Sequence, residues 1–270
     1  MLTLRRTLLA LVASCGLLAA TAAPSMAIVG GHDTSNAAYK GVAEVSLGGL
    51  FGCTGTLIAP QWVLTAGHCG SLTGAAVATP ISWPAPLITV RMGSNQAGAG
   101  TSYAVSAVSV PPEYLATQGH DISLLKLSAP ATGVPVTKIA GPSGRALWNP
   151  GVLEKIVGWG VTQEDGDAPS VLQEASVPII ADADCAAQES AFEADTMVCA
   201  GYPQGGTDTC QGDSGGPMFG TDALGALKLV GATSFGEGCA QAGHPGVYAR
   251  VADGVLRTWI GSKVPAALDS

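Results

Sequence analysis

The sequence has few charged and few aromatic residues. Charged residues make up 12% of its 270 residues, against about 25% in an average soluble protein, and aromatic residues make up 5%. Positive charge is the scarcer sign, with 12 Lys and Arg against 20 Asp and Glu. An acidic chain without a basic stripe repels phosphate, so we expect no nucleic-acid partner.

Long apolar runs are absent except near the start of the chain. Within residues 1–27, Arg5 and Arg6 are followed by an apolar stretch over 8–20 and then by small residues that end at Ala27. This order is typical of a secretory signal peptide, and the run is short for a membrane span. We therefore expect a secreted, extracellular protein that has no membrane contact once the signal is removed.

Two other interpretations of this segment remain open. Arg5 and Arg6 weakly resemble a twin-arginine export signal. The stretch Val12-Ala13-Ser14-Cys15 weakly resembles a bacterial lipoprotein cleavage box. Cleavage there would leave Ile28 inside the chain, against the interpretation of Ile28 given below.

Closely spaced cysteine or histidine pairs of the kind that bind metals are also missing. Of the seven cysteines, only Cys15 lies in the signal segment. The even number that remains predicts three disulfides in an exported chain, although spacing alone does not select the pairing. No Asp or Glu lies between Cys69 and Val110, so we expect no calcium there. We expect no metal and no other cofactor.

The sequence is rich in glycine and in short β-branched segments bounded by turn residues. This pattern predicts an all-β sandwich or barrel. The segments predicted as strands include 41–47, 56–66, 87–93, 102–110, 121–127, 153–160, 227–236 and 246–251. Near the end, apolar residues at helical spacing predict a short helix from Asp253, as N-cap, to about Ser262. The Pro- and Gly-rich stretch 128–144 is the best candidate for a join between two halves.

Three short blocks carry residues suited to nucleophilic catalysis. Ser214 lies in TCQGDSGGP, where neighbouring glycines let the backbone turn sharply and direct N–H groups at a reacting oxygen. A serine hydroxyl needs a base, which His68 in LTAGHC would supply. Asp121 in GHDISLLKL would orient that histidine.

With these blocks in this order, the chain resembles a chymotrypsin-family serine protease, and within that family the trypsin branch. The segments IVGG, LTAGHC, DISLLKL, MVCAGY, DTCQGDSGGP, SFGEGC and PGVYARV all contribute to the resemblance. It covers essentially all of residues 28–260.

The resemblance implies a mechanism and an architecture. Ser214 would be the nucleophile, His68 the general base and then acid, and Asp121 the orienting group, with the N–H groups of Gly212 and Ser214 as the oxyanion hole. The implied fold has two six-stranded antiparallel β-barrels, over 28–135 with His68 and Asp121 and over 136–270 with Ser214, with the site between them. The implied disulfides are Cys53–Cys69, Cys185–Cys199 and Cys210–Cys239.

The same resemblance implies a specificity for Arg or Lys. Asp208, six residues before Ser214, would lie at the bottom of the specificity pocket and pair with a basic side chain. Gly236 and Gly246 would leave the pocket open. Phe235 stands where trypsins usually carry Trp, and Glu237 adds a charge near the rim. The complete set implied for substrate binding is Asp208, Ser234, Phe235, Gly236 and Gly246.

Ile28 is implied as the N-terminus of the mature enzyme, with its ammonium paired to Asp213. Ala27 precedes it instead of the Lys or Arg of animal zymogens. We therefore expect signal peptidase to cut after Ala27 and to release active enzyme. The alternative is an earlier cut near Ala22, followed by trimming of a tiny propeptide.

The expected partners are protein or peptide substrates and proteinaceous protease inhibitors, and we expect a monomer.

Two rival functions remain open. One is a catalytically silent member of the same fold that serves in binding. The other is an active protease with a different preference, which would follow if Asp208 did not face the pocket.

Overall fold

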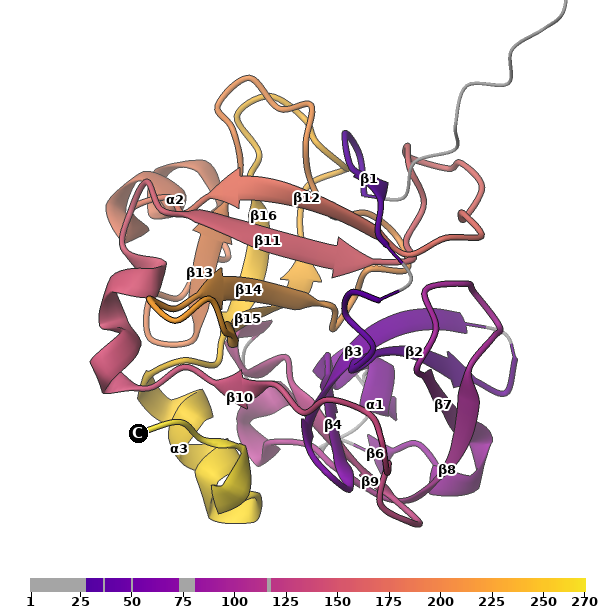
Figure 1. Ribbon diagram of the computed structural model, residues 1–270. Helices are drawn as coiled ribbons and strands as arrows, with labels where there is room; N and C mark the ends of the chain where they lie inside the picture. The colour runs from indigo at the N-terminus through magenta and orange to yellow at the C-terminus, as the bar shows by residue number, and fades with distance from the viewer. Residues whose placement is uncertain (1–27, 36, 50, 73–80, 116–117) are drawn as a thin grey trace, which may run out of the picture.

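The computed structural model describes residues 28–35, 37–49, 51–72, 81–115 and 118–270. The predicted signal segment 1–27 lies outside the described residues. The chain forms two β-rich halves, the first drawn in indigo to magenta and the second mostly in orange to yellow (Figure 1). Every segment predicted as a strand contains one.

The first half is a closed six-stranded barrel, as expected. Its order is β2 (Val42–Leu47), β3 (Phe51–Ala59), β4 (Trp62–Thr65), β9 (Ser123–Leu127), β8 (Thr101–Ser109) and β7 (Ile88–Met92). Alternate residues point inward, as the period of a strand requires. In β7, for example, Ile88, Val90 and Met92 are buried in the barrel core. A small hairpin, β5 (Ser71–Leu72) with β6 (Ile81–Ser82), lies beside this barrel.

The second half is built on one eight-stranded sheet, which also takes in β1 from the start of the described chain. Its path is β1 (His32–Asp33), β12 (Gln173–Pro178), β11 (Leu153–Gly158), β14 (Pro217–Thr221), β15 (Leu227–Phe235), β16 (Gly246–Arg250) and β13 (Met197–Ala200), and β10 (Lys138–Ile139) pairs with β15. The expected second closed barrel is not confirmed. Beyond the end of β12, a single bridge joins Ile179 to Ala200 of β13, so no continuous ladder closes the sheet.

Three α-helices are described. They are α1 (Gly67–Gly70), α2 (Asp182–Gln188) and α3 (Gly254–Lys263). The predicted terminal helix is confirmed as α3. Helix α2 was not predicted, because its sequence has too few apolar residues to show helical spacing. Asp253 occupies the N-cap position of α3 but makes no capping hydrogen bond. The predicted N-cap position is therefore confirmed, but the carboxylate accepts a hydrogen bond from Trp148 Nε1, at 3.3 Å, and none from the helix backbone.

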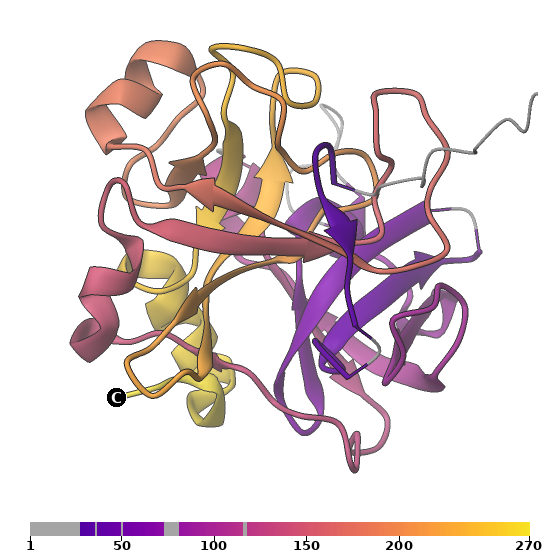
Figure 2. The same ribbon diagram turned by 45° about the horizontal axis from the view of Figure 1, so that its top comes forward.

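Short 3₁₀ turns complete the connections, namely η1 (Ala85–Leu87), η2 (Pro112–Leu115), η3 (Gln118–His120), η4 (Pro142–Trp148) and η5 (Pro265–Ala267). Helix α3 lies below the second sheet in the view of Figure 1, and a turned view shows the two halves side by side (Figure 2).

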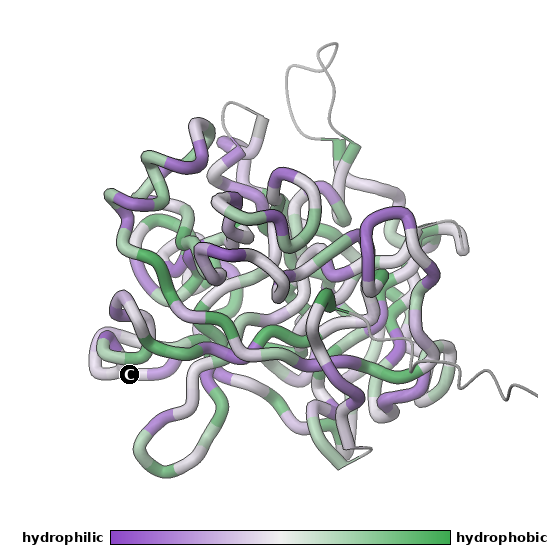
Figure 3. The backbone as a smooth tube through the Cα atoms, turned by 90° about the horizontal axis from the view of Figure 1, so that it is seen from above, coloured by the Kyte–Doolittle hydropathy of each residue, from purple (hydrophilic) through white to green (hydrophobic). Residues whose placement is uncertain are grey.

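One apolar cluster joins the two halves. It contains Ile58 and Leu64 of the barrel, Phe219 and Leu229 of the second sheet, and Ile260 of α3. Hydrophobic stretches accordingly run through the middle of the molecule (Figure 3). Since this cluster includes residues of β3 and β4 and of β14 and β15, it holds the segments that carry the site residues against one another.

Candidate active site

His68 and Asp121 meet because β4 and β9 are paired. Thr65 at the end of β4 is opposite Ser123 at the start of β9, so the segments flanking these residues run side by side. His68 Nδ1 lies 2.9 Å from Asp121 Oδ2 and 3.1 Å from Oδ1. The backbone N–H of His68 also donates to Asp121 Oδ1, at 2.9 Å. The ring is therefore held in one orientation.

The electrostatics of this pair favour the charged forms. Burial by itself lowers the pKa of His68, but the hydrogen bond and charge of Asp121 outweigh it, so the pKa is raised. Burial by itself raises the pKa of Asp121, but its hydrogen bonds from His68 and Ser234 and the nearby histidine lower it overall. Asp121 is thus an ionised, buried carboxylate that stabilises a protonated imidazole.

Ser234 is a contact of Asp121 that sequence reasoning missed. Its hydroxyl donates to Asp121 Oδ2 at 2.6 Å, across a separation of 113 residues. The resemblance had implied only a role in substrate binding for Ser234. No local pattern could reveal this hydrogen bond, because it depends on how the two halves pack.

Ser214 is placed on the same cavity as His68. The cavity, of ≈ 420 Å³, is also lined by Gly212 and by Cys53 and Cys69. Thr54 of the barrel donates its backbone N–H to Ser214 O at 2.9 Å, which fixes the serine loop against the first half. Gly215 has φ +77°, and a Cβ there would lie 2.1 Å from Thr65 Oγ1, so the turn after Ser214 requires glycine.

The predicted oxyanion donors lie beside this serine. In the described part of the chain, the backbone N–H groups of Gly212 and Ser214 have no protein acceptor. Both residues line the cavity that contains His68. Two unpaired N–H groups next to a serine hydroxyl are what a developing oxyanion requires.

A second cavity, of ≈ 180 Å³, is also lined by Ser214. Of the residues implied for substrate binding, Asp208, Ser234, Phe235 and Gly236 line it. Gly246 is not in this lining. A Cβ at Gly246 would lie 2.5 Å from Asp208 Oδ1, so glycine at this position leaves room for the carboxylate.

Asp208 is a buried carboxylate with two backbone donors. It is 4% exposed. Thr209 N–H donates to Oδ1 at 2.8 Å and Ala240 N–H donates to Oδ2 at 3.2 Å. Burial raises its pKa to about 6 in spite of these hydrogen bonds. The cavity therefore contains a negative charge at neutral pH that would be stabilised by a cation.

Asp213 is fully buried and lacks a cationic partner among the described residues. Gly160 N–H and Cys210 N–H donate to its two oxygens, at 2.8 and 2.9 Å. Burial raises its pKa to about 7. Ile28 is also fully buried, and the next residue, Val29, pairs with Asp208 through a backbone bridge.

The three disulfides have the pairing that the resemblance implied. Cys53–Cys69 joins β3 to α1, Cys185–Cys199 joins α2 to β13, and Cys210–Cys239 joins the serine loop to the segment after β15. The first and third tether the segments of His68 and Ser214. The ligand atoms of Cys53, Cys69 and His68 lie within 4.8 Å of one another, but the two sulfurs are bonded to each other and supply no thiolate for a metal.

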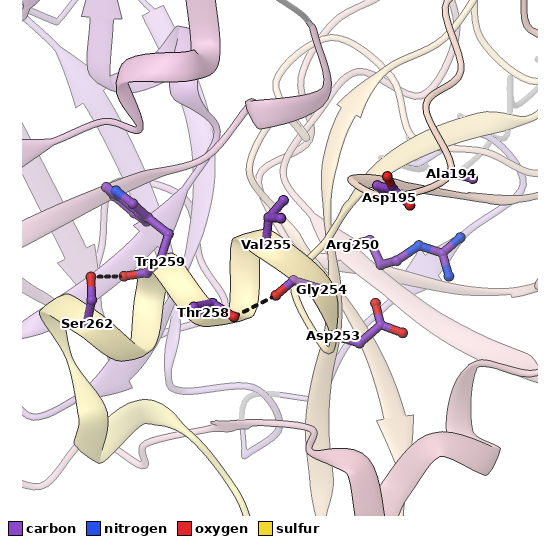
Figure 4. Close-up of a pocket in the computed structure, with 9 residues that line it drawn as sticks. All are labelled: Ala194, Asp195, Arg250, Asp253, Gly254, Val255, Thr258, Trp259 and Ser262. Carbon is purple, nitrogen blue, oxygen red and sulfur yellow. Dashed lines mark hydrogen bonds between the residues drawn. The ribbon is translucent and has the colours of Figure 1, made fainter.

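A larger cavity, of ≈ 810 Å³, lies at α3, away from Ser214. Its lining includes Asp195, Arg250, Asp253 and Trp259 (Figure 4). Arg250 is engaged there already, since it bonds Met197 O and the carboxylate of Asp182. This cavity contains no serine, histidine and aspartate arrangement of the kind described above.

Comparison with known proteins agrees with this geometry. The family model described as Trypsin matches residues 28–260. The chain belongs to the trypsin family. It is 43% identical over 230 residues to a trypsin of Saccharopolyspora erythraea, covering 83% of this chain and 93% of that protein. It is 39% identical over 225 residues to Trypsin 5G1 of Aedes aegypti, covering 80% and 78% of the two chains.

This trypsin-family protein is thus a serine endopeptidase, and its substrates are proteins. Trypsin-like proteases with disulfides are typically extracellular. Among the described helices of this protease, none is long and apolar enough to cross a membrane.

Proposed function

We propose that this protease is secreted and hydrolyses peptide bonds after Arg or Lys, through Ser214, His68 and Asp121. The observation that carries the specificity is the buried carboxylate of Asp208 in the cavity that adjoins Ser214. The guanidinium of Arg would form two parallel hydrogen bonds to it, and Lys would bind as a point charge.

The proposed reaction follows from the position of each group. The Ser214 hydroxyl attacks the carbonyl carbon of the scissile bond while His68 Nε2 takes the hydroxyl proton. The oxyanion that forms accepts hydrogen bonds from the N–H groups of Gly212 and Ser214. The imidazolium then gives its proton to the leaving amine. Water then attacks the acyl carbonyl while His68 Nε2 takes a proton from it, and the imidazolium gives that proton to Ser214 Oγ as the ester C–O bond breaks, which releases the acid product and regenerates Ser214.

The two halves contribute different parts of this site. We propose that the half over 28–135 supplies the proton-transfer pair and that the half over 136–270 supplies the nucleophile, the oxyanion donors and the specificity pocket. The apolar cluster between the halves and the hydrogen bond from Ser234 to Asp121 support this division. The hydrogen bond also couples the pocket wall to the catalytic pair.

Maturation at Ile28 is the second part of the proposal. Ile28 has φ +56°, which is strained for a β-branched residue. Cleavage removes this constraint and creates an ammonium. Asp213, buried and without a cation among the described residues, would then gain a partner. Signal peptidase would make this cut directly during export. The other route is a cut near Ala22, followed by trimming of the tiny propeptide that remains before Ile28.

For partners, we propose protein substrates and proteinaceous inhibitors that fill the same cavities, and a monomer in solution.

The deciding experiment for specificity compares matched peptide substrates that carry Arg, Lys, Phe or Leu before the scissile bond. The proposal expects kcat/KM for Arg and Lys to exceed the others by orders of magnitude. Equal rates would refute the assignment of Asp208.

Covalent labelling tests the catalytic assignment separately. An organophosphonate should modify Ser214 stoichiometrically in the mature enzyme, and His68→Ala should abolish the modification. A mature, folded chain that is not labelled would indicate a catalytically silent member of the family.

A further inference from the structure

The basic residues after which this protease would cut its own chain are few, and most are protected. Of the 12 Lys and Arg residues, Arg5 and Arg6 lie in the segment 1–27, and the other ten are described. Six of these lie in paired strands, namely Arg91, Lys126, Lys138, Lys155, Lys228 and Arg250. A protease cuts a folded chain only where the backbone opens locally, so bonds within a ladder are cut slowly.

The bond after Lys40 is held between several segments, although it lies in a turn. Lys40 O accepts the N–H of Gly93 at 3.1 Å, and Gly41 O accepts the N–H of Leu57 at 2.8 Å. Gly41 is buried, and a Cβ there would lie 2.3 Å from Pro135 O. The backbone on both sides of this bond is therefore fixed by close packing.

Helix α3 protects the bonds after Arg257 and Lys263. Arg257 lies inside the helix, and Lys263 is its last residue. Val264, which follows, is 3% exposed, belongs to the apolar cluster between the halves and donates its N–H to Ile260 O at 2.7 Å. A cut after Lys263 thus requires the end of α3 to leave the core.

The bond between Arg145 and Ala146 is the exception. It lies in η4, at the outer edge of the second half in both ribbon views (Figures 1 and 2), and both residues are exposed. Arg145 Nη1 bonds Trp148 O at 3.4 Å and Asn149 Oδ1 at 3.3 Å, and the guanidinium lies 5.1 Å from the centre of the Trp148 ring. These contacts are local and 3₁₀ hydrogen bonds are weak, so a small opening of η4 frees the bond.

Trp148 limits how far η4 opens. Its side chain is 2% exposed, and its Nε1 donates to Asp253 Oδ2 at 3.3 Å. The end of η4 therefore stays anchored while the residues before it open, and we expect a cut there to be slow but to precede every other cut.

A cut at this bond would divide the catalytic groups between two chains. Of the three disulfides in the described chain, none spans the bond: they are Cys53–Cys69 before it and Cys185–Cys199 and Cys210–Cys239 after it. One chain, 28–145, would carry His68 and Asp121. The other, 146–270, would carry Ser214.

Non-covalent contacts between these two chains are extensive. Strands β1 and β10 of the first pair with β12 and β15 of the second. The apolar cluster contains residues of both, and the hydrogen bond from Ser234 to Asp121 also joins them. The site therefore stays assembled after a cut for as long as the two chains stay bound.

We propose that Arg145–Ala146 is the self-cleavage site of this protease, and that the cut produces a two-chain enzyme without a covalent link between its chains. One molecule cuts another: water adds across the peptide bond, the C–N bond breaks, and a carboxylate forms on Arg145 and an ammonium on Ala146. The inference rests on the proposed function, because it requires cleavage after Arg. It adds a modification site that makes the lifetime of the activity depend on dilution.

The test uses the mature Ser214→Ala chain as substrate and a catalytic amount of active enzyme, so that only cuts between molecules are seen. Mass analysis should find one early pair of fragments, which end at Arg145 and begin at Ala146. Non-reducing denaturing electrophoresis should separate them, whereas gel filtration in native buffer should show one species. A first cut at another bond, no cut after prolonged incubation, or fragments that separate in native buffer would overturn the inference.

Variants of the substrate chain test the role of accessibility. Arg145→Gln should abolish the early cut, and the matched control Lys263→Gln, which removes another exposed basic residue, should change its rate by less than about twofold. Asp167→Arg places a basic residue before the exposed Ala168 in the loop between β11 and β12. This chain should be cut after residue 167 at least about tenfold faster than after Arg145, because an exposed irregular loop opens more readily. No faster cut there would contradict control by accessibility.

The active enzyme tests the consequence of the cut. Enzyme nicked by itself should keep its kcat/KM per active site, but the urea midpoint of its activity loss should fall as the enzyme is diluted, because unfolding now separates two chains. Active Arg145→Gln should show the parent kcat/KM and a midpoint that does not depend on concentration. A midpoint independent of concentration in the nicked enzyme would refute the two-chain form.

Failure of the proposed function is distinguishable from failure of this inference. In the first case the parent cuts no Arg or Lys peptide, and an unrelated endopeptidase specific for Arg and Lys still nicks Ser214→Ala first at Arg145–Ala146. A parent that cuts Arg peptides but cuts Ser214→Ala first at another bond refutes only the self-cleavage site.

Discussion

Replacement of Asp208 by Asn tests the specificity pocket most directly. The carboxylate is 4% exposed and accepts backbone N–H groups from Thr209 and Ala240. Asn can accept only one of them through its carbonyl oxygen, and its NH₂ group would face the other donor. The variant therefore loses the negative charge and also a hydrogen bond that holds the loop 236–245.

The magnitude follows from the burial of the pair. Removing one partner of a buried charge pair costs about 2–5 kcal/mol. Each 1.4 kcal/mol corresponds to about a tenfold change, so kcat/KM for Arg and Lys substrates should fall by about 30-fold to several thousandfold. A Leu substrate should lose little, because it makes no ion pair and no longer has to desolvate a carboxylate.

The assay is kcat/KM for matched Arg, Lys and Leu substrates, measured against active-site concentration. The pH profile adds a second readout. With a pKa of about 6, Asp208 becomes protonated below this pH and no longer attracts a cation, so KM for Arg should rise as the pH falls. Asp208→Asn should abolish that rise. A variant that retains both the Arg preference and the acidic rise of KM would refute the assignment.

Three further outcomes are expected. Ser234→Ala removes the 2.6 Å hydrogen bond to Asp121, so kcat should fall about tenfold with little change of KM, as expected for the loss of a hydrogen bond to a charged group; a larger effect on KM would contradict this role. Glu154 is buried with both oxygens unpaired among the described residues, and burial raises its pKa to about 8. The pKa of Glu154 in the folded protein exceeds the ordinary 4.5, so the folded protein loses stability as the pH rises and this side chain ionises. Glu154→Gln should therefore raise the free energy of unfolding at pH 9 but not at pH 4, by at most about 5 kcal/mol. Urea unfolding of an inactivated enzyme at both pH values checks this, and equal effects would contradict it. Pairing with Asp213 should raise the pKa of a freed Ile28 ammonium above the usual value of about 8, so activity should be lost reversibly at high pH; mass analysis of the secreted chain should find Ile28 first, and an active product that begins earlier would refute the ion pair.

The candidate site could be predicted from the sequence because its chemistry lies in short blocks. The glycines around Ser214 and the segments around His68 and Asp121 are local patterns, and local backbone demands require those residue types there. The alternation in 87–93 and the helical spacing in 253–262 likewise predicted β7 and α3, since inward-facing positions repeat with the period of the element.

Other features depend on contacts between distant parts of the chain. The second closed barrel is not confirmed, because the segment after β12 joins β13 through a single bridge, from Ile179 to Ala200, and no strand pattern in the sequence encodes such a long-range contact. Asp253 is the N-cap residue of α3, but its carboxylate bonds Trp148 and not the helix backbone, because packing brings an indole N–H to it.

What the sequence by itself determined, then, is the set of candidate reactive groups, their order, the strands that carry them and, through the family resemblance, the pairing of the cysteines. Only the tertiary structure decided that Ser234 donates a hydrogen bond to Asp121 and that Asp208 and Asp213 are buried. The physical reason is that burial and long-range hydrogen bonds set the energies of charged groups, and both arise only when the two halves pack together.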